Sequence, residues 1–131
     1  MTRRTSNSAR LSRSAEFERV YRQGRSTANR HLVLYAFPNP SVRVPRLGLS
    51  VSRKVGGAVE RNRVKRLLRE AFAQSAAEMV AGHDLVVVAR PPIGELVERE
   101  GLAGVQAAMA ELVGRAGLRD GSQDKAVESS S

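Results

Sequence analysis

The feature that most constrains the fold is an amphipathic helix pattern enclosed by two strand patterns. Apolar residues recur at the spacing of one helical face, which predicts a helix over 58–79 that stops before Gly82. The residues of that face are Val64, Leu67, Leu68, Ala71 and Phe72. Before the helix, residues 46–54 alternate between apolar and small residues, and residues 83–90 after it contain a continuous apolar run. The sequence therefore predicts a strand–helix–strand unit.

A second, shorter helix is expected near the N-terminus. Ser14 is a typical N-cap residue, and Gly24 is a typical stop. Phe17, Val20 and Tyr21 fall at i, i+3 and i+4, so they share one face. This face has two interpretations: a plain core stripe, or an aromatic surface that stacks single-stranded RNA, since arginines surround it. Those arginines are Arg13, Arg19, Arg22 and Arg25.

Two further elements complete the expected domain. Residues 30–38 are rich in β-formers and predict a strand that places Tyr35 on the face opposite Leu34. Apolar residues at helical spacing predict a last helix, which Gly101 and Gly104 weaken. These apolar residues are Leu102, Val105, Met109, Leu112 and Val113.

The charge distribution indicates a polyanionic partner. The formal charge of +9 comes from 22 lysines and arginines against 13 acidic residues. Residues 1–70 hold 17 of the basic residues and only 4 of the acids, whereas residues 71–131 hold 5 and 9. Such asymmetry favours nucleic acid or an anionic membrane surface as the partner.

The composition excludes several other classes of protein. The absence of cysteine rules out a disulfide framework, a thiolate metal site and a cysteine nucleophile, and two histidines are too few for a His-rich metal cluster. No apolar run approaches the ~20 residues of a membrane span, so a cytoplasmic protein is expected. We expect a flexible basic arm over 1–10, a single α/β domain over 11–117 and a disordered tail over 118–131.

Basic residues gather on the side of the 58–79 helix that faces away from its apolar stripe. Between Arg53 and Arg69, seven basic residues accompany one acid, Glu60. Like charges four residues apart repel by roughly a few tenths of a kcal/mol, and a merely solvated helix usually interleaves glutamates. A phosphate-binding surface is therefore favoured over a solvated charge run, and free N–H groups at the helix start should add to it. The residues of this surface are Arg61, Asn62, Arg63, Lys65, Arg66 and Arg69.

Residues 46–72, RLGLSVSRKVGGAVERNRVKRLLREAF, resemble the signature of the bacterial ribonuclease P protein component. The central mark of that signature is the Arg-Asn-Arg run, which lies here at 61–63. The resemblance extends upstream over residues 11–35 and downstream over residues 83–91. The Arg-Asn-Arg run alone would mean little, but the ordered composite pattern is highly specific.

The resemblance implies a two-layer α/β sandwich in which helices pack on a small mixed sheet. It also implies an unusual left-handed βαβ crossover, formed here by strand 46–52, helix 58–79 and strand 83–90. General rules of chain connection alone predict a right-handed crossover. The sequence departs from the family pattern at Gly57, where a larger polar residue is common, and at Tyr21, where phenylalanine is common. A tyrosine ring can still stack on a base.

The resemblance further implies the protein subunit of a ribonucleoprotein endonuclease, which removes the 5′ leader from precursor tRNA. The expected partners are the catalytic RNA subunit and precursor tRNA, with no membrane and no obligate protein partner. The RNA is expected to hold Mg²⁺ and to hydrolyse the phosphodiester bond, so the protein has no catalytic residue, metal or cofactor of its own. The protein would raise the affinity for precursor tRNA and lower the metal-ion requirement. The scarcity of carboxylates agrees with this, because residues 1–70 offer only Glu16, Glu18, Glu60 and Glu70.

Two RNA contacts follow from the resemblance. The basic surface of helix 58–79 would dock on the catalytic RNA, and a central cleft would take the single-stranded leader. The residues that match the family's cleft are Phe17, Tyr21, Tyr35, Arg53, Lys54 and Arg90. Whether Phe17 is mainly a core residue or a stacking contact stays open. Ser50 and Ser52 would line the open sheet face, and His31 and His83 are expected to be structural.

Three other functions compete with this one. A ribosomal or general RNA-binding protein would bind phosphates without selecting a 5′ leader. A metal-dependent nuclease acting alone would cleave RNA without an RNA subunit, and the few carboxylates argue against it. A helix-turn-helix DNA-binding protein is disfavoured because the basic helix lies between two strands.

Overall fold

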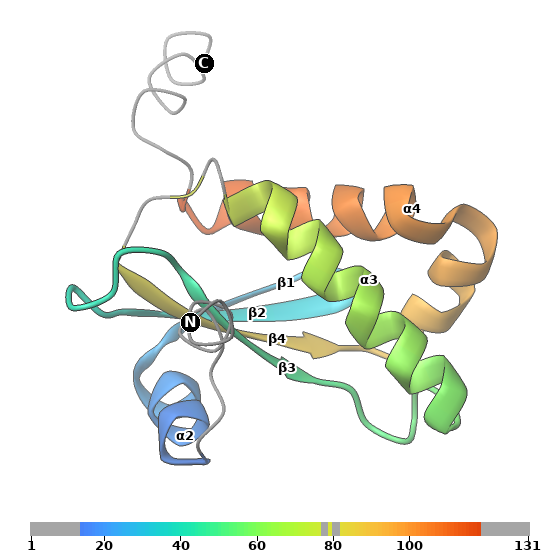
Figure 1. The fold of residues 1–131 in the computed structure, drawn as a ribbon, viewed down its shortest axis with the longest axis horizontal. Helices are drawn as coiled ribbons and strands as arrows, with labels where there is room; N and C mark the ends of the chain where they lie inside the picture. The colour runs from blue at the N-terminus through green and yellow to red at the C-terminus, as the bar shows by residue number, and fades with distance from the viewer. Residues whose placement is uncertain (1–13, 77–78, 80–81, 119–131) are drawn as a thin grey trace, which may run out of the picture.

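The computed structural model describes residues 14–76, 79 and 82–118. A four-stranded mixed sheet carries two helices on one face and one short helix on the other (Figure 1). The elements are α2 (Ser14–Gln23), β1 (Arg25–Ala28), β2 (Leu32–Pro38), β3 (Arg46–Ser50), α3 (Ala58–Ala76), β4 (His83–Ala89) and α4 (Ile93–Arg115). The expected architecture, helices packed on a small mixed sheet, is confirmed.

The strands lie in the order β1-β2-β4-β3. β1 pairs with β2 and β2 with β4 in antiparallel fashion, whereas β3 and β4 are parallel neighbours. The parallel pair requires a crossover, which α3 supplies on the face that α4 also covers (Figure 1). In that view α3 lies above the sheet and β3 lies in front of β4, so the crossover is left-handed.

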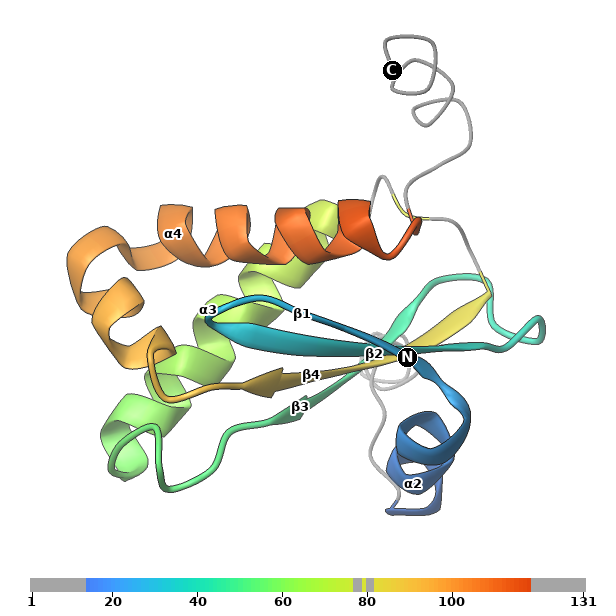
Figure 2. The same ribbon diagram turned by 180° about the vertical axis from the view of Figure 1, so that it is seen from behind.

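The main core lies between the sheet and the helices α3 and α4. Alternate residues of β2 point into it, and α3 contributes Val64 and Leu68, both essentially inaccessible to solvent. Seen from behind, α4 lies over β1 and β2, whereas α2 is on the opposite face (Figure 2). Leu118, one residue beyond the predicted end of the domain, is also buried in this core. The predicted arm over 1–10, and the predicted tail after Leu118, lie outside the described residues.

Two elements differ from the sequence expectation. β1 was not predicted because its four residues, RSTA, are polar or small and show no apolar alternation. The last helix begins at Ile93 rather than near Leu102, and it bends at Gly101, whose φ of 58° and ψ of −141° are not helical. Glycine adopts this conformation without the steric cost that a Cβ atom would impose. The element Ile93–Arg115 thus consists of two helical segments that meet at a kink at Gly101.

Candidate nucleic-acid interface

α3 presents a basic surface on the side away from its buried face. Asn62, Arg63, Arg66 and Arg69 are exposed on it, and Arg61 and Lys65 are half-buried. Within the part of the chain that the structure describes, Arg63, Lys65 and Arg66 take part in none of the ion pairs. The charges of these three residues are therefore not neutralised by salt bridges to other described residues, which leaves them available for phosphate groups.

The basic surface has two flanks with different surroundings. Arg63 lies beside a cavity of about 290 Å³ between α3 and the beginning of α4, together with Glu60, Glu95 and Glu98. These carboxylates reduce the positive potential on that flank. Arg66 is exposed like Arg63, but it does not line this cavity with its carboxylates. Arg66 is therefore better placed than Arg63 to meet a polyanion.

The start of α3 carries one internal cap. The N–H of Gly57, the residue before the helix, donates to Oε1 of Glu60 at 3.0 Å, so the helix supplies its own carboxylate there. The expectation that the free N–H groups of the first helical turn bind an anion stays a prediction. Arg61 follows in the first turn, and its Nε is buried without a hydrogen-bond partner in the described structure. The basic side chains of α3 begin in its first turn, with Arg61.

Three predicted aromatic residues, Phe17, Tyr21 and Tyr35, come together on the other face of the sheet. The rings of Tyr21 and Tyr35 meet edge to face, with 4.9 Å between their centroids, and Phe17 lies 6.5 Å from Tyr21. The Tyr21 residue remains 38% exposed. Phe17 also packs against a small buried cluster of Val20 and Val86, so it is partly a core residue. We call Phe17, Tyr21 and Tyr35 the aromatic group.

An exposed strip of sheet extends from the aromatic group toward the predicted basic residues. Next to Tyr35, the strand register aligns Val33, Val88 and Ser50 across β2, β4 and β3, and all three are half-buried. Arg90 follows two residues after Val88 and is exposed. Four residues separate the row of Tyr35 from Arg90, which corresponds to about 13 Å along β4. The aromatic group and Arg90 thus lie at two ends of one strip and do not form a single cluster.

The three predicted cleft cations lie where β3 and β4 end. Arg53 and Lys54 belong to the exposed turn that leads from β3 toward α3. The guanidinium of Arg90 donates to the backbone carbonyl of Asn29 at 2.8 Å, which ties it to the β1–β2 turn. Because β3 and β4 are parallel, their carboxyl ends meet at one edge of the sheet. This edge also carries the chain into α3, so it joins the strip to the basic surface.

A buried ion network fixes α2 on the sheet. Nε and Nη2 of Arg46 donate to the fully buried carboxylate of Asp84 at 2.8 and 2.9 Å, and Asn39 donates to it at 3.0 Å. The remaining guanidinium nitrogen of Arg46 lies 3.2 Å from a carboxylate oxygen of Glu16 on α2. Burial alone raises the pKa of Asp84, but the hydrogen bonds from Arg46 and Asn39 outweigh it and lower that pKa below its usual value. Arg46 therefore connects β4 to the helix that carries Phe17 and Tyr21.

Sequence reasoning missed this network, although one signal was present. Asp84 interrupts the apolar run HDLVVVA, and a charged residue within a buried strand requires a partner. The partner could not be identified, because Arg46 is one of many arginines in the sequence. His83 is the first residue of β4, and its expected structural role stays a prediction.

Metal-binding and membrane-spanning features were also sought. Among the residues that the structure describes, no three histidine or acidic side chains lie close enough to hold a metal ion. Over the same residues, no helix has the length and apolar character required to cross a bilayer.

Comparison with known proteins identifies the family. The family model described as Ribonuclease P matches residues 5–116. The chain belongs to the ribonuclease P protein family. The ribonuclease P protein component of Geobacillus thermodenitrificans is 41% identical over 108 residues, which cover 82% of this chain and 86% of that one.

Solved structures of the family have the same fold. The RNase P protein of Staphylococcus aureus matches with a TM-score of 0.76 at 34% identity, covering 86% of this chain and 98% of that one. The RNase P protein of Thermotoga maritima matches with a TM-score of 0.73 at 32% identity, covering 81% and 96%. The resemblance found in the sequence is thereby confirmed. The family is that of the protein component of ribonuclease P, an endoribonuclease complex, which implies an RNA partner and a role in tRNA 5′-end processing.

Proposed function

We propose that this chain binds the single-stranded 5′ leader of precursor tRNA on its sheet and docks on the catalytic RNA through α3. The observation that carries this proposal is the aromatic group, which lies on the sheet face opposite the main core. Tyr21 is 38% exposed there, while Phe17 and Tyr35 are half-buried against the small cluster of Val20 and Val86. Aromatic rings accept any base by stacking, so they suit a leader whose sequence varies. The proposal assigns bond hydrolysis and its Mg²⁺ to the RNA subunit, as the resemblance to the family implies.

Selectivity for precursor tRNA follows from the position of this strip. Only the precursor has a leader that can reach Tyr21 and Tyr35, so mature tRNA gains nothing from them. Each base that stacks on an aromatic side chain contributes about 1–3 kcal/mol. At the other end of the strip, Arg53, Lys54 and Arg90 attract the phosphates of the leader as it leaves the catalytic RNA.

The basic surface of α3 provides the second contact. Its arginine side chains can donate hydrogen bonds to the oxygens of phosphate groups, and Asn62 can hydrogen-bond to the sugar-phosphate backbone of the RNA. Every phosphate neutralised by the protein is one that metal ions need not screen. Docking through α3 should therefore lower the Mg²⁺ concentration that the RNA requires, and should weaken as salt increases.

Reconstitution with a bacterial catalytic RNA tests the function. The chain is added at low Mg²⁺, and cleavage of precursor tRNA is measured together with the dissociation constants of precursor and mature tRNA. We expect faster cleavage and tighter binding of the precursor only. Unchanged cleavage after addition of the folded chain would contradict the proposal.

The variant Tyr21→Ala tests the leader contact in the same assay. It should weaken precursor binding by about 1–3 kcal/mol and leave mature tRNA binding unchanged, because it removes one stacking ring. The matched control is Gln23→Ala, which alters an exposed residue of the same helix outside the aromatic group. Equal losses for precursor and mature tRNA would refute the leader contact.

A further inference from the structure

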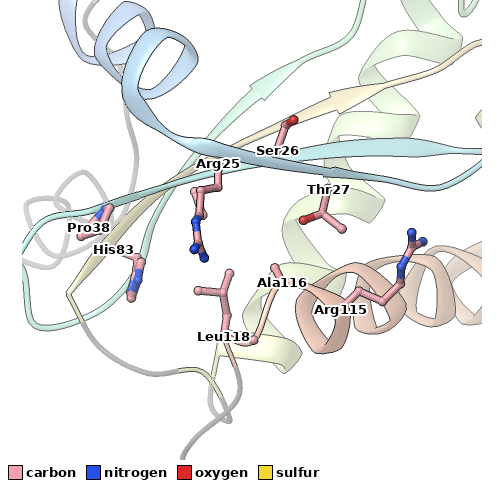
Figure 3. Close-up of a pocket in the computed structure, with 10 residues that line it drawn as sticks. Arg25, Ser26, Thr27, Pro38, His83, Arg115, Ala116 and Leu118 are labelled. Carbon is pink, nitrogen blue, oxygen red and sulfur yellow. The ribbon is translucent and has the colours of Figure 1, made fainter.

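A second cavity lies on the opposite side of the edge strand β1 from the aromatic group. It has a volume of about 600 Å³ and is enclosed by β1, the end of β2, the beginning of β4 and the C-terminal end of α4 (Figure 3). Its lining includes Arg25, Thr27, Pro38, His83, Arg115 and Leu118. Volumes of about 300–1,000 Å³ are typical of sites for small organic ligands. The cavity is therefore large enough for part of a nucleotide.

Arg25 gives this cavity its charge. Its guanidinium points into the cavity, whereas Ser26, the next residue of β1, points to the other face of the sheet (Figure 3). In the described structure, Arg25 is exposed and takes part in no ion pair or side-chain hydrogen bond. Arg115 is already engaged, since it donates to the carbonyl of Ala28 at 3.0 Å and lies 3.6 Å from Glu111. Arg25 is thus the cation that remains for a ligand.

The other groups around the cavity also suit an anion. No acidic side chain occurs among the described residues that line it. The carbonyl end of α4 is nearby, but the N–H groups of Ala116, Gly117 and Leu118 donate to carbonyls of its last turns. These bonds occupy the carbonyls that would otherwise repel an anion. Thr27 adds a hydroxyl on the same side of β1 as Arg25 (Figure 3).

The cavity and the aromatic group are close neighbours across one strand. Ser26 pairs with Tyr35 in the strand register, and Arg25 precedes Ser26. β1 is the outermost strand of the sheet, and adjacent strands lie about 4.8 Å apart. An RNA strand that leaves Tyr35 therefore has to pass only the edge of β1 to reach Arg25.

We propose that this cavity binds a nucleotide of the 5′ leader that lies beyond those stacked on the aromatic group, with its phosphate held by Arg25. This inference rests on the proposed function, because it extends the path of the same leader. The path begins at Arg90, crosses the sheet to Tyr35 and turns around β1 into the cavity. A planar guanidinium can donate two parallel hydrogen bonds to a phosphate, which fixes the strand at that point.

The test uses the reconstituted holoenzyme and precursor tRNAs whose leaders are lengthened one nucleotide at a time. Dissociation constants are measured over a range of salt concentrations for the wild type and for Arg25→Ala. The matched control is Arg99→Ala, which removes an equal charge from an exposed position on α4 that does not line the cavity. Thr27→Val provides a second variant that removes the hydroxyl from the cavity and retains the charge.

We expect wild-type affinity to increase in two steps as the leader lengthens. Arg25→Ala should remove only the second step, about tenfold, which is the size of one charged hydrogen bond. It should also lower the slope of log affinity against log salt by about 0.7 for long leaders alone. Thr27→Val should weaken the second step, and Arg99→Ala should leave both steps intact. An equal loss at every leader length, or no loss at any length, would overturn the inference.

The two proposals can fail separately in this experiment. If Tyr21→Ala weakens the binding of short leaders and Arg25→Ala changes nothing, the leader binds the sheet but does not reach the cavity. If Tyr21→Ala has no effect on any leader, the proposed function itself is wrong, and the inference fails with it.

Discussion

The buried network around Arg46 allows a stability effect to be worked out from the structure. The substitution Arg46→Met removes both hydrogen bonds of 2.8 and 2.9 Å to Asp84, whose residue is 0% exposed. Asn39 is then the remaining donor to a buried carboxylate. Removing one partner of a buried ion pair costs about 3–5 kcal/mol, because the other charge is left without compensation. We therefore expect the free energy of unfolding to fall by about that amount at pH 7.

Glu16→Gln provides the matched comparison on the other side of Arg46. The side chains of this pair are 17% and 20% exposed, and the two groups are 3.2 Å apart. The hydrogen bonds between Arg46 and Asp84 remain in this variant, so no buried charge loses its partner. The free energy of unfolding should therefore fall by only about 1 kcal/mol. The two variants differ in which interaction of Arg46 they remove. The difference between their free energies of unfolding therefore separates the cost of leaving the Asp84 charge unpaired from the cost of losing the ion pair that holds α2.

The same network predicts a pH dependence of defined sign. The pKa of Asp84 is lowered in the folded state, chiefly by Arg46 against the opposing effect of burial, so its stabilising contribution is present above the unfolded value of about 3.9. This contribution is lost as the pH falls through the folded pKa. Without Arg46, burial raises the pKa of Asp84, so the carboxylate of the variant is protonated at a higher pH than that of the wild type. The cost of Arg46→Met should therefore shrink as the pH falls from the raised pKa of the variant to the lowered pKa of the wild type.

Urea unfolding followed by far-ultraviolet circular dichroism measures these quantities, since the chain has no tryptophan. The transitions are recorded at pH 7 and at a series of lower pH values. A cost below about 1 kcal/mol for Arg46→Met at pH 7 would refute the argument that Asp84 depends on this partner. So would a cost that stays constant as the carboxylate is protonated.

Three further predictions concern single positions. Arg66→Glu should impair assembly with the catalytic RNA and lower the salt slope of binding by about 0.9 per lost phosphate contact, measured by filter binding; normal assembly of the folded variant would remove α3 from the interface. Gly101→Ala should cost about 1–3 kcal/mol in thermal unfolding, because its φ of 58° strains any residue with a Cβ atom, and an unchanged melting temperature would contradict this. Gly24→Ala should displace α2, because its Cβ would lie 2.5 Å from the carbonyl oxygen of Val20 and 2.8 Å from that of Ala36; the expected readout is a loss of precursor selectivity, and retained selectivity would show that α2 tolerates the shift.

The parts of the fold that the sequence predicted are those whose signal is local and periodic. The apolar spacing in α3 gave the correct buried face, because Val64, Leu68, Ala71 and Phe72 are all buried. The strand patterns around it also correspond to β3 and β4 within a few residues. The handedness of their crossover came from the resemblance alone, since spacing along a chain carries no information about it.

The parts that the sequence could not predict depend on contacts between distant segments. Helical spacing placed Phe17 beside Tyr21, but the contact of Tyr21 with Tyr35 exists only because α2 packs on β2. β1 has no apolar periodicity, so its pairing with β2 could not be inferred. The first half of α4 did have a helical signal in Ile93, Leu96 and Val97, which two preceding prolines obscured. Proline is in fact common at the first turn of a helix.

The arrangement of the sheet explains how one small domain can meet two RNA molecules in the proposed function. The basic surface belongs to α3, which covers one face of the sheet, whereas α2 lies on the other face (Figures 1 and 2). The aromatic group is on the α2 side, where Phe17 and Tyr35 pack against Val20 and Val86. A polyanion docked on α3 therefore does not compete with a strand that stacks on Tyr21. The two surfaces meet at the edge where β3 and β4 end, and Arg53 and Arg90 are located there. In the proposed function, a leader that emerges from the catalytic RNA at this edge contacts first the cations and then the aromatic rings. Electrostatic attraction to its phosphates then promotes the encounter, and stacking of its bases stabilises the bound strand.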